Sequence, residues 1–170
     1  MSLLGLGSNL SSSFGDRFEN LNLAASYLEA YKIKIIKRSS FYETPSYPNI
    51  KSPKFINIVI EVSTYLPPED LASVLIFVEE KLERKRMKKN EPRTCDIDII
   101  DYNGKVMDFT YKSLIFRVPH EKLIYRNFVL FPLQEIAPKW IHPKTKDSID
   151  TLINKLPNVD KKSILKIKKS

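Results

Sequence analysis

The sequence predicts an α+β fold, because strand-like and helix-like segments alternate in a defined order along its first two thirds. Residues 2–7, 33–42, 55–63 and 97–100 are short apolar runs rich in β-branched side chains, as strands are. Residues 14–30 and 67–82 repeat apolar side chains every three or four positions, as amphipathic helices do. The order β-α-β-β-α-β is that of the ferredoxin-like split βαβ core, in which helices pack on an antiparallel sheet.

The first half of this core begins with the strand over residues 2–7, which ends in the turn Gly7-Ser8-Asn9. The helix over residues 14–30 follows, with apolar residues at the helical spacing Phe18, Leu21, Ala25 and Leu28. The strand over residues 33–42 opens with alternating Ile and Lys, so one side of it should face solvent. Residues 43–54 contain three prolines and little periodicity, which predicts a loop before the strand over residues 55–63.

The second half of the core starts at the helix over residues 67–82. Its start signal is Pro67-Pro68-Glu69-Asp70, because proline and acidic residues favour the first helical turn. A basic loop leads to the strand at residues 97–100, and Asn103-Gly104 predicts a hairpin turn after it. A C-terminal extension is expected to add strands over residues 106–118, a short helix over residues 121–130 and a last helix over residues 151–156.

We expect a single domain over residues 1–160 and a basic, partly disordered tail over residues 161–170, because chain ends tolerate runs of charge. The single cysteine, Cys95, excludes an internal disulfide, and two histidines are too few for a typical structural zinc site. No run of about 18 apolar residues predicts a membrane span, and the N-terminus has no signal-peptide pattern. A cytoplasmic protein is therefore expected, with a monomer as the simplest state.

The net charge of +8 at pH 7 indicates an anionic partner, although charge alone does not distinguish nucleotide, nucleic acid and membrane. Between Lys81 and Arg93 there are seven basic residues and two acidic ones. The chain contains neither G-x-x-x-x-G-K-[ST] nor G-x-G-x-x-G, the glycine-rich loops that bind phosphates through backbone amides. Any phosphates must therefore be bound by side chains, for which Arg84, Arg86 and Arg93 are suited because guanidinium groups bind phosphate oxygens in pairs.

Two aspartates at the start of the last core strand are the most informative pair in the chain. Because side chains alternate along a strand, Asp96 and Asp98 should share one sheet face while Ile97 and Ile99 enter the core. Two neighbouring carboxylates repel each other unless a positive charge lies between them. A hard cation such as Mg²⁺, held by one or two carboxylates and substrate phosphates, meets this need and indicates phosphoryl or pyrophosphoryl transfer. An edge strand whose acids pair with nearby arginines would show the same pattern.

Several segments, taken in order, resemble the 6-hydroxymethyl-7,8-dihydropterin pyrophosphokinase family, from Gly5 to about Pro143. The most specific element is P-R-x-x-D-x-D, present here as residues 92–98. The other similar segments are residues 5–10, 15–17, 39–45, 55–57, 118–120 and 126–138, together with Glu79, Arg84 and Arg86 at the end of the second helix.

The resemblance implies transfer of pyrophosphate from ATP to the hydroxymethyl group of the dihydropterin, with release of AMP, in folate biosynthesis. It implies a catalytic group of Arg84, Arg93, Asp96 and Asp98, in which the two aspartates hold two Mg²⁺ ions. The residues implied for ATP are Glu79, Arg84, Arg86, Arg93, Ile99, Arg117, His120 and Arg126. Those implied for the pterin are Thr44, Pro45, Tyr47, Phe55, Asn57, Asp96 and Phe128, with both Phe rings stacked on it. The expected partners are ATP and a dihydropterin alcohol, without nucleic acid or membrane.

Two other interpretations stay open at this point. A ferredoxin-like sheet with basic loops can bind RNA through aromatic residues on its strands, although the K/R-G-F-G-F motif is absent and paired aspartates would repel phosphates. An inactive relative is the other, and Glu83 is the only indication of it, because the family commonly has glycine at this position.

Overall fold

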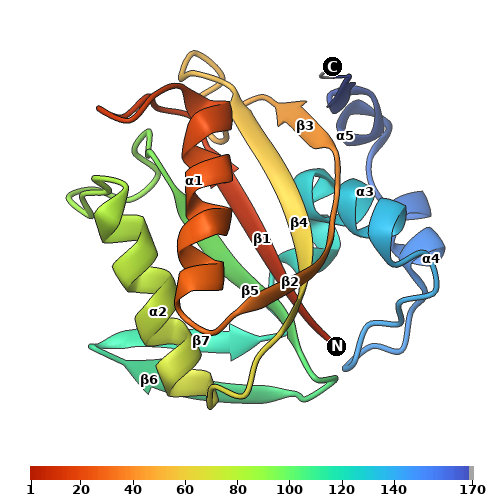
Figure 1. Cartoon of the computed structure of the whole chain (residues 1–170). Coiled ribbons are helices and arrows are strands. Elements are labelled where there is room, and N and C mark those ends of the chain that lie inside the picture. Colours follow the sequence, from red (N-terminus) through yellow and green to blue (C-terminus); the bar gives the residue numbers. More distant parts are fainter. Residues whose placement is uncertain (169–170) are drawn as a thin grey trace.

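The computed structural model describes residues 1–168 and has the predicted α+β architecture, with a central antiparallel sheet between two layers of helices (Figure 1). The elements are β1 (Ser2–Ser8), α1 (Arg17–Ala30), β2 (Lys34–Arg38), β3 (Phe41–Thr44), β4 (Phe55–Ser63), α2 (Pro68–Lys81), β5 (Asp96–Tyr102), β6 (Met107–Tyr111), β7 (Leu114–Val118), the 3₁₀ turn η1 (Leu123–Tyr125), α3 (Asn127–Ile136), α4 (Ile149–Asn154), α5 (Asn158–Lys162) and β8 (Leu165–Ile167). The strand order β5-β1-β4-β3-β8, with β2 also on β4, contains the ferredoxin-like arrangement.

Two apolar cores lie on opposite faces of this sheet. Helices α1 and α2 cover one face, where Leu4, Leu21 and Leu75 are fully buried or nearly so. Helices α3 and α4 pack on the other face with Leu3 and Leu130, which are both fully buried. The alternation of side chains along β1 and β5 therefore supplies both cores at once, and it leaves Asp96 and Asp98 on the α3 face.

The sheet register brings the functional segments abreast. Strand β1 lies between β4 and β5, and Gly7 pairs with Asn57 on one side and with Asp96 on the other. Gly5 likewise pairs with Val59 and Asp98. The two aspartates and Asn57 thus face the same side of three neighbouring strands, with only glycine backbone between them.

The strand expected over residues 33–42 is two strands, β2 and β3, which both pair with β4. The break comes at Ser39, whose hydroxyl oxygen accepts a hydrogen bond from the Val59 amide at 3.0 Å. A side chain here replaces a backbone ladder partner, which is how serine interrupts regular structure.

The turn expected at Asn103-Gly104 is present, but the predicted hairpin is wrong, because the strands on either side of the turn do not pair with each other. Both residues have positive φ angles, 52° and 71°, as the expected turn requires. Strand β6, however, leaves β5 and pairs with β7 in a separate two-stranded sheet, which lies beside α2 and β5 (Figure 1). This second sheet was not expected, because the sequence pattern of residues 106–118 does not specify a partner.

The helix expected over residues 121–130 is also divided. It is the 3₁₀ turn η1 followed by α3, and between them Arg126 is extended with φ −108° and ψ 102°. At this break the Arg126 side chain makes a contact distant in sequence, because its Nη1 donates to Asp98 Oδ2 at 3.1 Å. The last expected helix, over residues 151–156, is α4, which starts at Ile149 behind the N-cap Ser148.

The end of the chain takes part in the fold. The boundary expected at residue 160 falls inside α5, and β8 pairs with β3 through Phe41↔Ile167 and Glu43↔Leu165. Within the tail expected over residues 161–170, β8 is a short strand that pairs with β3 at the edge of the sheet. Residues 169 and 170 lie outside the described part. No helix among residues 1–168 is long and apolar enough to cross a membrane.

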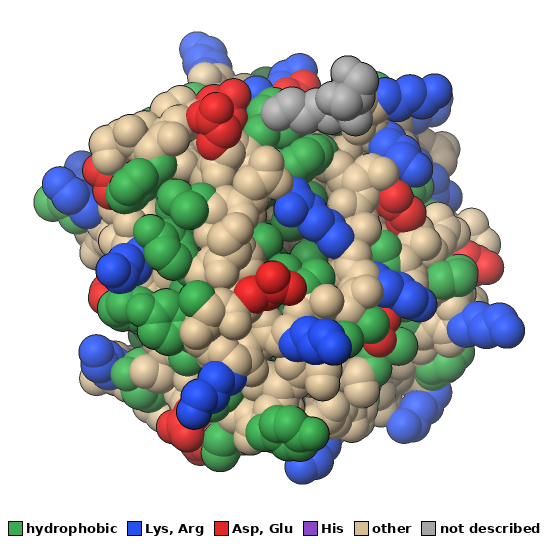
Figure 2. Space-filling view, viewed as in Figure 1, with side chains coloured by type: hydrophobic (Ala, Val, Ile, Leu, Met, Phe, Trp, Pro, Cys, Tyr) green, Lys and Arg blue, Asp and Glu red, His purple; other side chains and the backbone are tan. Residues whose placement is uncertain are grey.

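Charge on the surface is not restricted to the basic loop. On the face seen in Figure 2, Lys and Arg side chains are scattered, and apolar side chains gather over α1 and α2. Tyr31, the C-cap residue of α1, packs edge to face on Phe77 of α2, with ring centroids 5.1 Å apart.

Candidate active site

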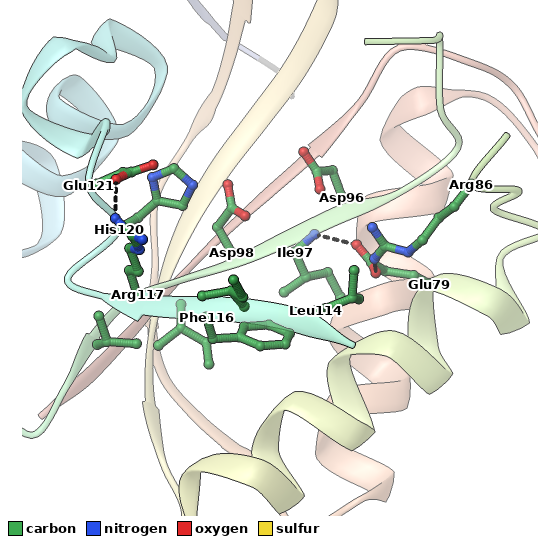
Figure 3. A pocket seen from close by; sticks show the side chains of 13 residues that line it. Glu79, Arg86, Asp96, Ile97, Asp98, Leu114, Phe116, Arg117, His120 and Glu121 are labelled. Carbon is green, nitrogen blue, oxygen red and sulfur yellow. Dashed lines mark hydrogen bonds and ion pairs between the residues drawn. The ribbon is translucent and has the colours of Figure 1, made fainter. Parts of the chain in front are cut away.

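The two aspartates project from the same side of β5, as the strand period requires (Figure 3). Each of them pairs with arginine. Asp96 accepts a hydrogen bond from Arg84 Nη1 at 2.8 Å, and its other oxygen lies 3.3 Å from Arg93 Nε. Asp98 accepts from Arg126 Nη1 at 3.1 Å. The three arginines come from the basic loop and from the start of α3, so residues from three segments meet at the aspartates.

The two carboxyl groups are electrostatically unequal. Burial opposes ionisation of Asp96, but Arg93 and Arg84 outweigh it and lower the pKa of this carboxyl below its usual value. For Asp98, burial and then the charge of Asp96 raise the pKa to about 6, and Arg126 offsets only part of this. The negative charge of Asp96 is therefore stable, whereas that of Asp98 is easily lost by protonation. A cation bound next to the two carboxylates would stabilise both charges.

A third acid, Glu79, lies at the end of α2 beside this pair. Its carboxylate accepts hydrogen bonds from Arg84 Nη1, from Arg86 Nη2 and from the backbone amide of Ile97, the last at 2.9 Å. Burial raises the pKa of Glu79 to about 7, against the opposing effect of Arg84.

A cavity of about 420 Å³ opens beside the three acids (Figure 3). One wall is polar and the other is the apolar side of β7, formed by Leu114, Ile115 and Phe116. Phe116 also stacks on Phe109 of β6 with ring centroids 5.0 Å apart, so the neighbouring strand supports this wall. Five of the residues expected around ATP line this cavity, as do the two aspartates: Glu79, Arg86, Ile99, Arg117 and His120. Arg84, Arg93 and Arg126, which were also expected around ATP, are not among its lining residues.

His120 is a neutral donor at the edge of this cavity. Burial, followed by the charge of Arg126, lowers its pKa to about 4. Its Nδ1 atom accepts a hydrogen bond from the Lys122 amide at 3.1 Å, so Nε2 carries the proton. Arg117, by contrast, is exposed and pairs with Glu121 at 3.1 Å.

Of the residues expected around the pterin, Asp96 lines this cavity, whereas Phe55, Asn57 and Phe128 are not among its lining residues. The guanidinium carbon of Arg93 lies over the Phe55 ring, 5.1 Å from the ring centroid. The guanidinium carbon of Arg126 lies over the Phe128 ring, 5.4 Å from its centroid. Each ring is thus joined through an arginine to one of the two aspartates.

Asn57 is buried on β4, next to Thr44, where the loop over residues 45–54 (the pterin loop) begins. Its amide nitrogen donates to Thr44 Oγ1 at 3.0 Å, which leaves the amide oxygen pointing to Gly7. Pro45 and Tyr47 follow Thr44 in this loop, and the Tyr47 side chain is 82% exposed. The structure therefore brings Asn57 and Thr44 together and leaves Tyr47 in solvent.

The family described as 7,8-dihydro-6-hydroxymethylpterin-pyrophosphokinase (HPPK) matches residues 3–138. The chain belongs to the HPPK family. Its 2-amino-4-hydroxy-6-hydroxymethyldihydropteridine pyrophosphokinase relative in Synechocystis is 32% identical, covering 91% of this chain and 75% of that protein. The Aquifex aeolicus protein of the same name is 36% identical and 82% of each chain is covered. The fol1 folic acid synthesis protein of Pneumocystis carinii is 35% identical, but this chain spans only 21% of its length.

Solved structures support the HPPK fold independently of sequence identity. The wild-type Plasmodium falciparum HPPK-DHPS structure with pteroate has a TM-score of 0.73 at 16% identity, covering 91% of this chain and 44% of that one. An HPPK-DHPS structure in complex with substrates has a TM-score of 0.70 at 17% identity, covering 90% and 42%.

Sequence reasoning missed one residue of this HPPK site, Asn9. Its amide oxygen accepts from the Arg93 backbone at 2.7 Å, and its amide nitrogen donates to Ser46 at 3.0 Å. Asn9 therefore ties β1 to both the arginine loop and the pterin loop. The only local sign of Asn9 is its place in the turn Gly7-Ser8-Asn9, and a turn residue does not by itself indicate contacts with two other loops.

Glu83, the departure from the HPPK pattern, forms no ion pair with Arg84 or Arg86, which pair with Glu79 among the described residues. Glu83 has a positive φ of 68°, as the usual glycine would, and its carboxylate accepts a hydrogen bond from the Ser13 amide at 2.5 Å. That contact connects Glu83 to the loop before α1, so the Glu83 carboxylate is bound to a backbone amide outside the cavity.

Proposed function

We propose that this HPPK-family chain transfers pyrophosphate from ATP to the hydroxymethyl group of 6-hydroxymethyl-7,8-dihydropterin, giving AMP and the pterin diphosphate in folate biosynthesis. The observation that carries the proposal is that Asp96 and Asp98 line the cavity and pair with Arg93 and Arg126, which lie over the rings of Phe55 and Phe128. Relatives that are 32–37% identical over most of the chain bear the pyrophosphokinase name.

The cavity suits a nucleotide with its base against β7 and its phosphates towards β5. The apolar side chains of Leu114 and Phe116 offer a surface for a flat base. Arg84 uses only Nη1 for its contacts and Arg86 uses only Nη2, so both retain donors free of hydrogen bonds to residues 1–168. Those donors, with Nε2 of His120, would bind phosphate oxygens.

The two carboxylates fit a hard divalent cation, and we propose two Mg²⁺ ions there. No group of three or more His, Cys, Asp or Glu side chains that could hold a metal lies within the described residues. Asp96 and Asp98 would therefore supply the protein's share of ligands, and phosphate oxygens would supply others. When bound, the ions neutralise charge on the triphosphate and orient the reacting groups.

The chemistry then depends on position and charge, without a nucleophilic side chain. The pterin hydroxyl oxygen bonds to the β-phosphorus, the bond from that phosphorus to the AMP oxygen breaks, and the hydroxyl proton is lost to solvent. Arg84 and Arg93 would stabilise charge on the group in transit, because fixed donors act strongly in a partly buried site. Phe55 and Phe128 would hold the pterin between their rings.

Product analysis tests this function. Mass spectrometry of a reaction with ATP, Mg²⁺ and the dihydropterin alcohol should show a pterin carrying two added phosphoryl groups and equimolar AMP. Formation of ADP and a monophosphate would contradict the proposal. We also propose a cytoplasmic monomer, and light scattering after size-exclusion chromatography tests the oligomeric state.

Replacing Gly7 with alanine should weaken pterin binding selectively. The added methyl would lie 3.0 Å from Asn57 Oδ1, so this side chain must shift, and it would make an ordinary contact with the Phe55 ring at 3.5 Å. We expect the KM for the pterin to rise about tenfold or more, because small displacements in a site are costly, with the KM for ATP unchanged. Gly5→Ala is the matched control, since among residues 1–168 its methyl would contact only Ile100. An unchanged pterin KM in Gly7→Ala would contradict the assignment.

Replacing Phe128 with alanine should also act on the pterin. Loss of one stacking ring is worth about 1–2 kcal/mol, which corresponds to a rise of about tenfold in the pterin KM. Phe131→Ala, a partly buried ring on the same helix, is the control for general damage to α3. Equal changes in both variants would show that Phe128 acts through stability alone.

Metal affinity of the ligand-free protein should depend on pH through Asp98. Because its pKa is raised to about 6, this carboxyl is protonated below pH 6 and must release the proton when a cation binds. Affinity for Mn²⁺, measured by electron paramagnetic resonance, should fall about tenfold per pH unit below 6 and level off above it. In Asp98→Asn the affinity should be weak and nearly flat from pH 5 to 8. A flat profile in the wild-type protein would contradict the assignment.

A further inference from the structure

We propose that Glu79 is a positioning residue: its buried carboxylate fixes two phosphate-binding arginines relative to the aspartate strand and does not itself contact the nucleotide. This differs from the sequence-based expectation, which placed Glu79 among the ATP contacts. The inference rests on the proposed function only for the identity of the ligand, ATP.

The carboxylate of Glu79 has little capacity left for a ligand. The residue is only 2% exposed, and both of its oxygens are in use. Oε1 accepts from Arg86 Nη2, while Oε2 accepts from Arg84 Nη1 and from the Ile97 amide at 2.9 Å. A ribose or phosphate group that reached Glu79 would have to displace one of these donors, two of which are charged.

The three donors belong to two segments that must be held in register. Arg84 and Arg86 lie in the loop after α2, whereas the Ile97 amide lies between the two aspartates on β5. Helix α2 carries Glu79 in its last turn and packs on the sheet, so the carboxylate has a rigid support. One side chain thus sets the distance and orientation between the arginine loop and the aspartates.

The contacts also decide which nitrogens of the arginines remain free to bind a ligand. Arg84 Nη1 is shared among Glu79, Asp96 at 2.8 Å and the Cys95 carbonyl at 3.2 Å. Nε and Nη2 of Arg84 make no hydrogen bond to residues 1–168 and remain available as donors. Without the charge on Glu79, Asp96 would be the remaining acidic partner of Arg84. The guanidinium would then turn towards a carboxylate needed elsewhere and present fewer donors to phosphate.

Glu79→Gln is the test, because it keeps the shape and an acceptor for the Ile97 amide but removes the charge that holds the arginines. We expect the affinity for a non-hydrolysable ATP analogue with Mg²⁺ to fall about tenfold or more, since hydrogen bonds to charged groups are the strong ones. The KM for the pterin at saturating ATP should stay within about twofold. Glu80→Gln, at the exposed neighbouring position, should change neither quantity.

A double-mutant cycle with Arg86→Gln distinguishes positioning from contact. If Glu79 acts through the arginines, Glu79→Gln should cost less analogue affinity in the Arg86→Gln background than in the wild-type protein, because only Arg84 is then left for it to position. Fully additive losses would overturn the proposal, because they would mean that Glu79 acts independently of Arg86. Equal rises in both KM values, with a lowered melting temperature, would also overturn it in favour of a role in folding.

The outcome stays separable from that of the proposed function. A wild-type protein that binds the analogue but forms no AMP would refute the function, yet the binding cycle would still decide the role of Glu79. Should Glu79→Gln fail to fold, Glu79→Asp supplies a shorter carboxylate. It should then show the same selective loss of analogue affinity, and an unchanged affinity would overturn the proposal.

Discussion

Replacing Asp98 with asparagine should lower the rate of pterin diphosphate formation by about a thousandfold or more while the protein stays folded. Asparagine keeps the shape but removes the second negative charge, and stabilisation of transferring phosphoryl charge by a metal is worth several kcal/mol. Folding should be little affected, because burial and the neighbouring Asp96 already make the Asp98 charge unfavourable, raising its pKa to about 6. Arg126 loses its partner but remains partly exposed to solvent.

Steady-state kinetics at saturating substrates and a thermal melt check both halves of this expectation. Asp108→Asn is the matched control, since Asp108 is an exposed acid on β6 outside the cavity. A variant at Asp98 with more than about a tenth of wild-type activity would exclude the carboxylate as a metal ligand, because a ligand is worth far more than one factor of ten.

Arg84→Ala should be the most destabilising substitution in the site. The side chain of Arg84 is only 12% exposed and it partners Glu79, whose side chain is 3% exposed. Removing one member of a buried ion pair leaves the other charge without compensation, so we expect a loss of about 3 kcal/mol in the free energy of unfolding. Arg86 still contacts Glu79, which keeps the expected loss at the lower end of the range for buried pairs.

The loss should depend on pH in a defined direction. Glu79 has a pKa raised from 4.5 to about 7 in the folded chain, so the cost of its charge is largest above pH 7. The loss caused by Arg84→Ala should shrink as the pH falls from 7 towards 4.5, because the Glu79 carboxyl becomes protonated in the folded chain over this range. Urea unfolding at pH 5 and pH 8 measures this, with Lys85→Ala as the exposed control. An equal loss at both values would contradict the role of the Glu79 charge.

The fold was predictable where a local pattern decides structure. Strand β4 has the predicted bounds because its alternating, β-branched run is closed by prolines and polar residues at both ends. Helix α2 follows its proline and acidic start signal. The break between β2 and β3, the separate sheet of β6 and β7, and the division of η1 from α3 involve partners far away in sequence. Those partners, such as Val59 for Ser39, are set only by the tertiary fold.

The site shows the same division. The strand period alone placed Asp96 and Asp98 on one face, and the register confirmed their common direction. The bonds of Glu79 to residues 84, 86 and 97 were not predictable, because one helix end, one loop and one strand must meet to make them. The neutral state of His120 likewise follows from burial and Arg126, which no local pattern reveals.

The measurement that tests the account most directly is the formation of AMP from ATP by wild-type protein and by Asp98→Asn. With Mg²⁺ and the dihydropterin alcohol both present, wild-type protein should form AMP and pterin diphosphate in equal amounts, and omission of either should stop the reaction. Asp98→Asn should form almost none under the same conditions. Folded wild-type protein that produces no AMP at saturating substrates would contradict the assignment of a pyrophosphokinase site around Asp96 and Asp98.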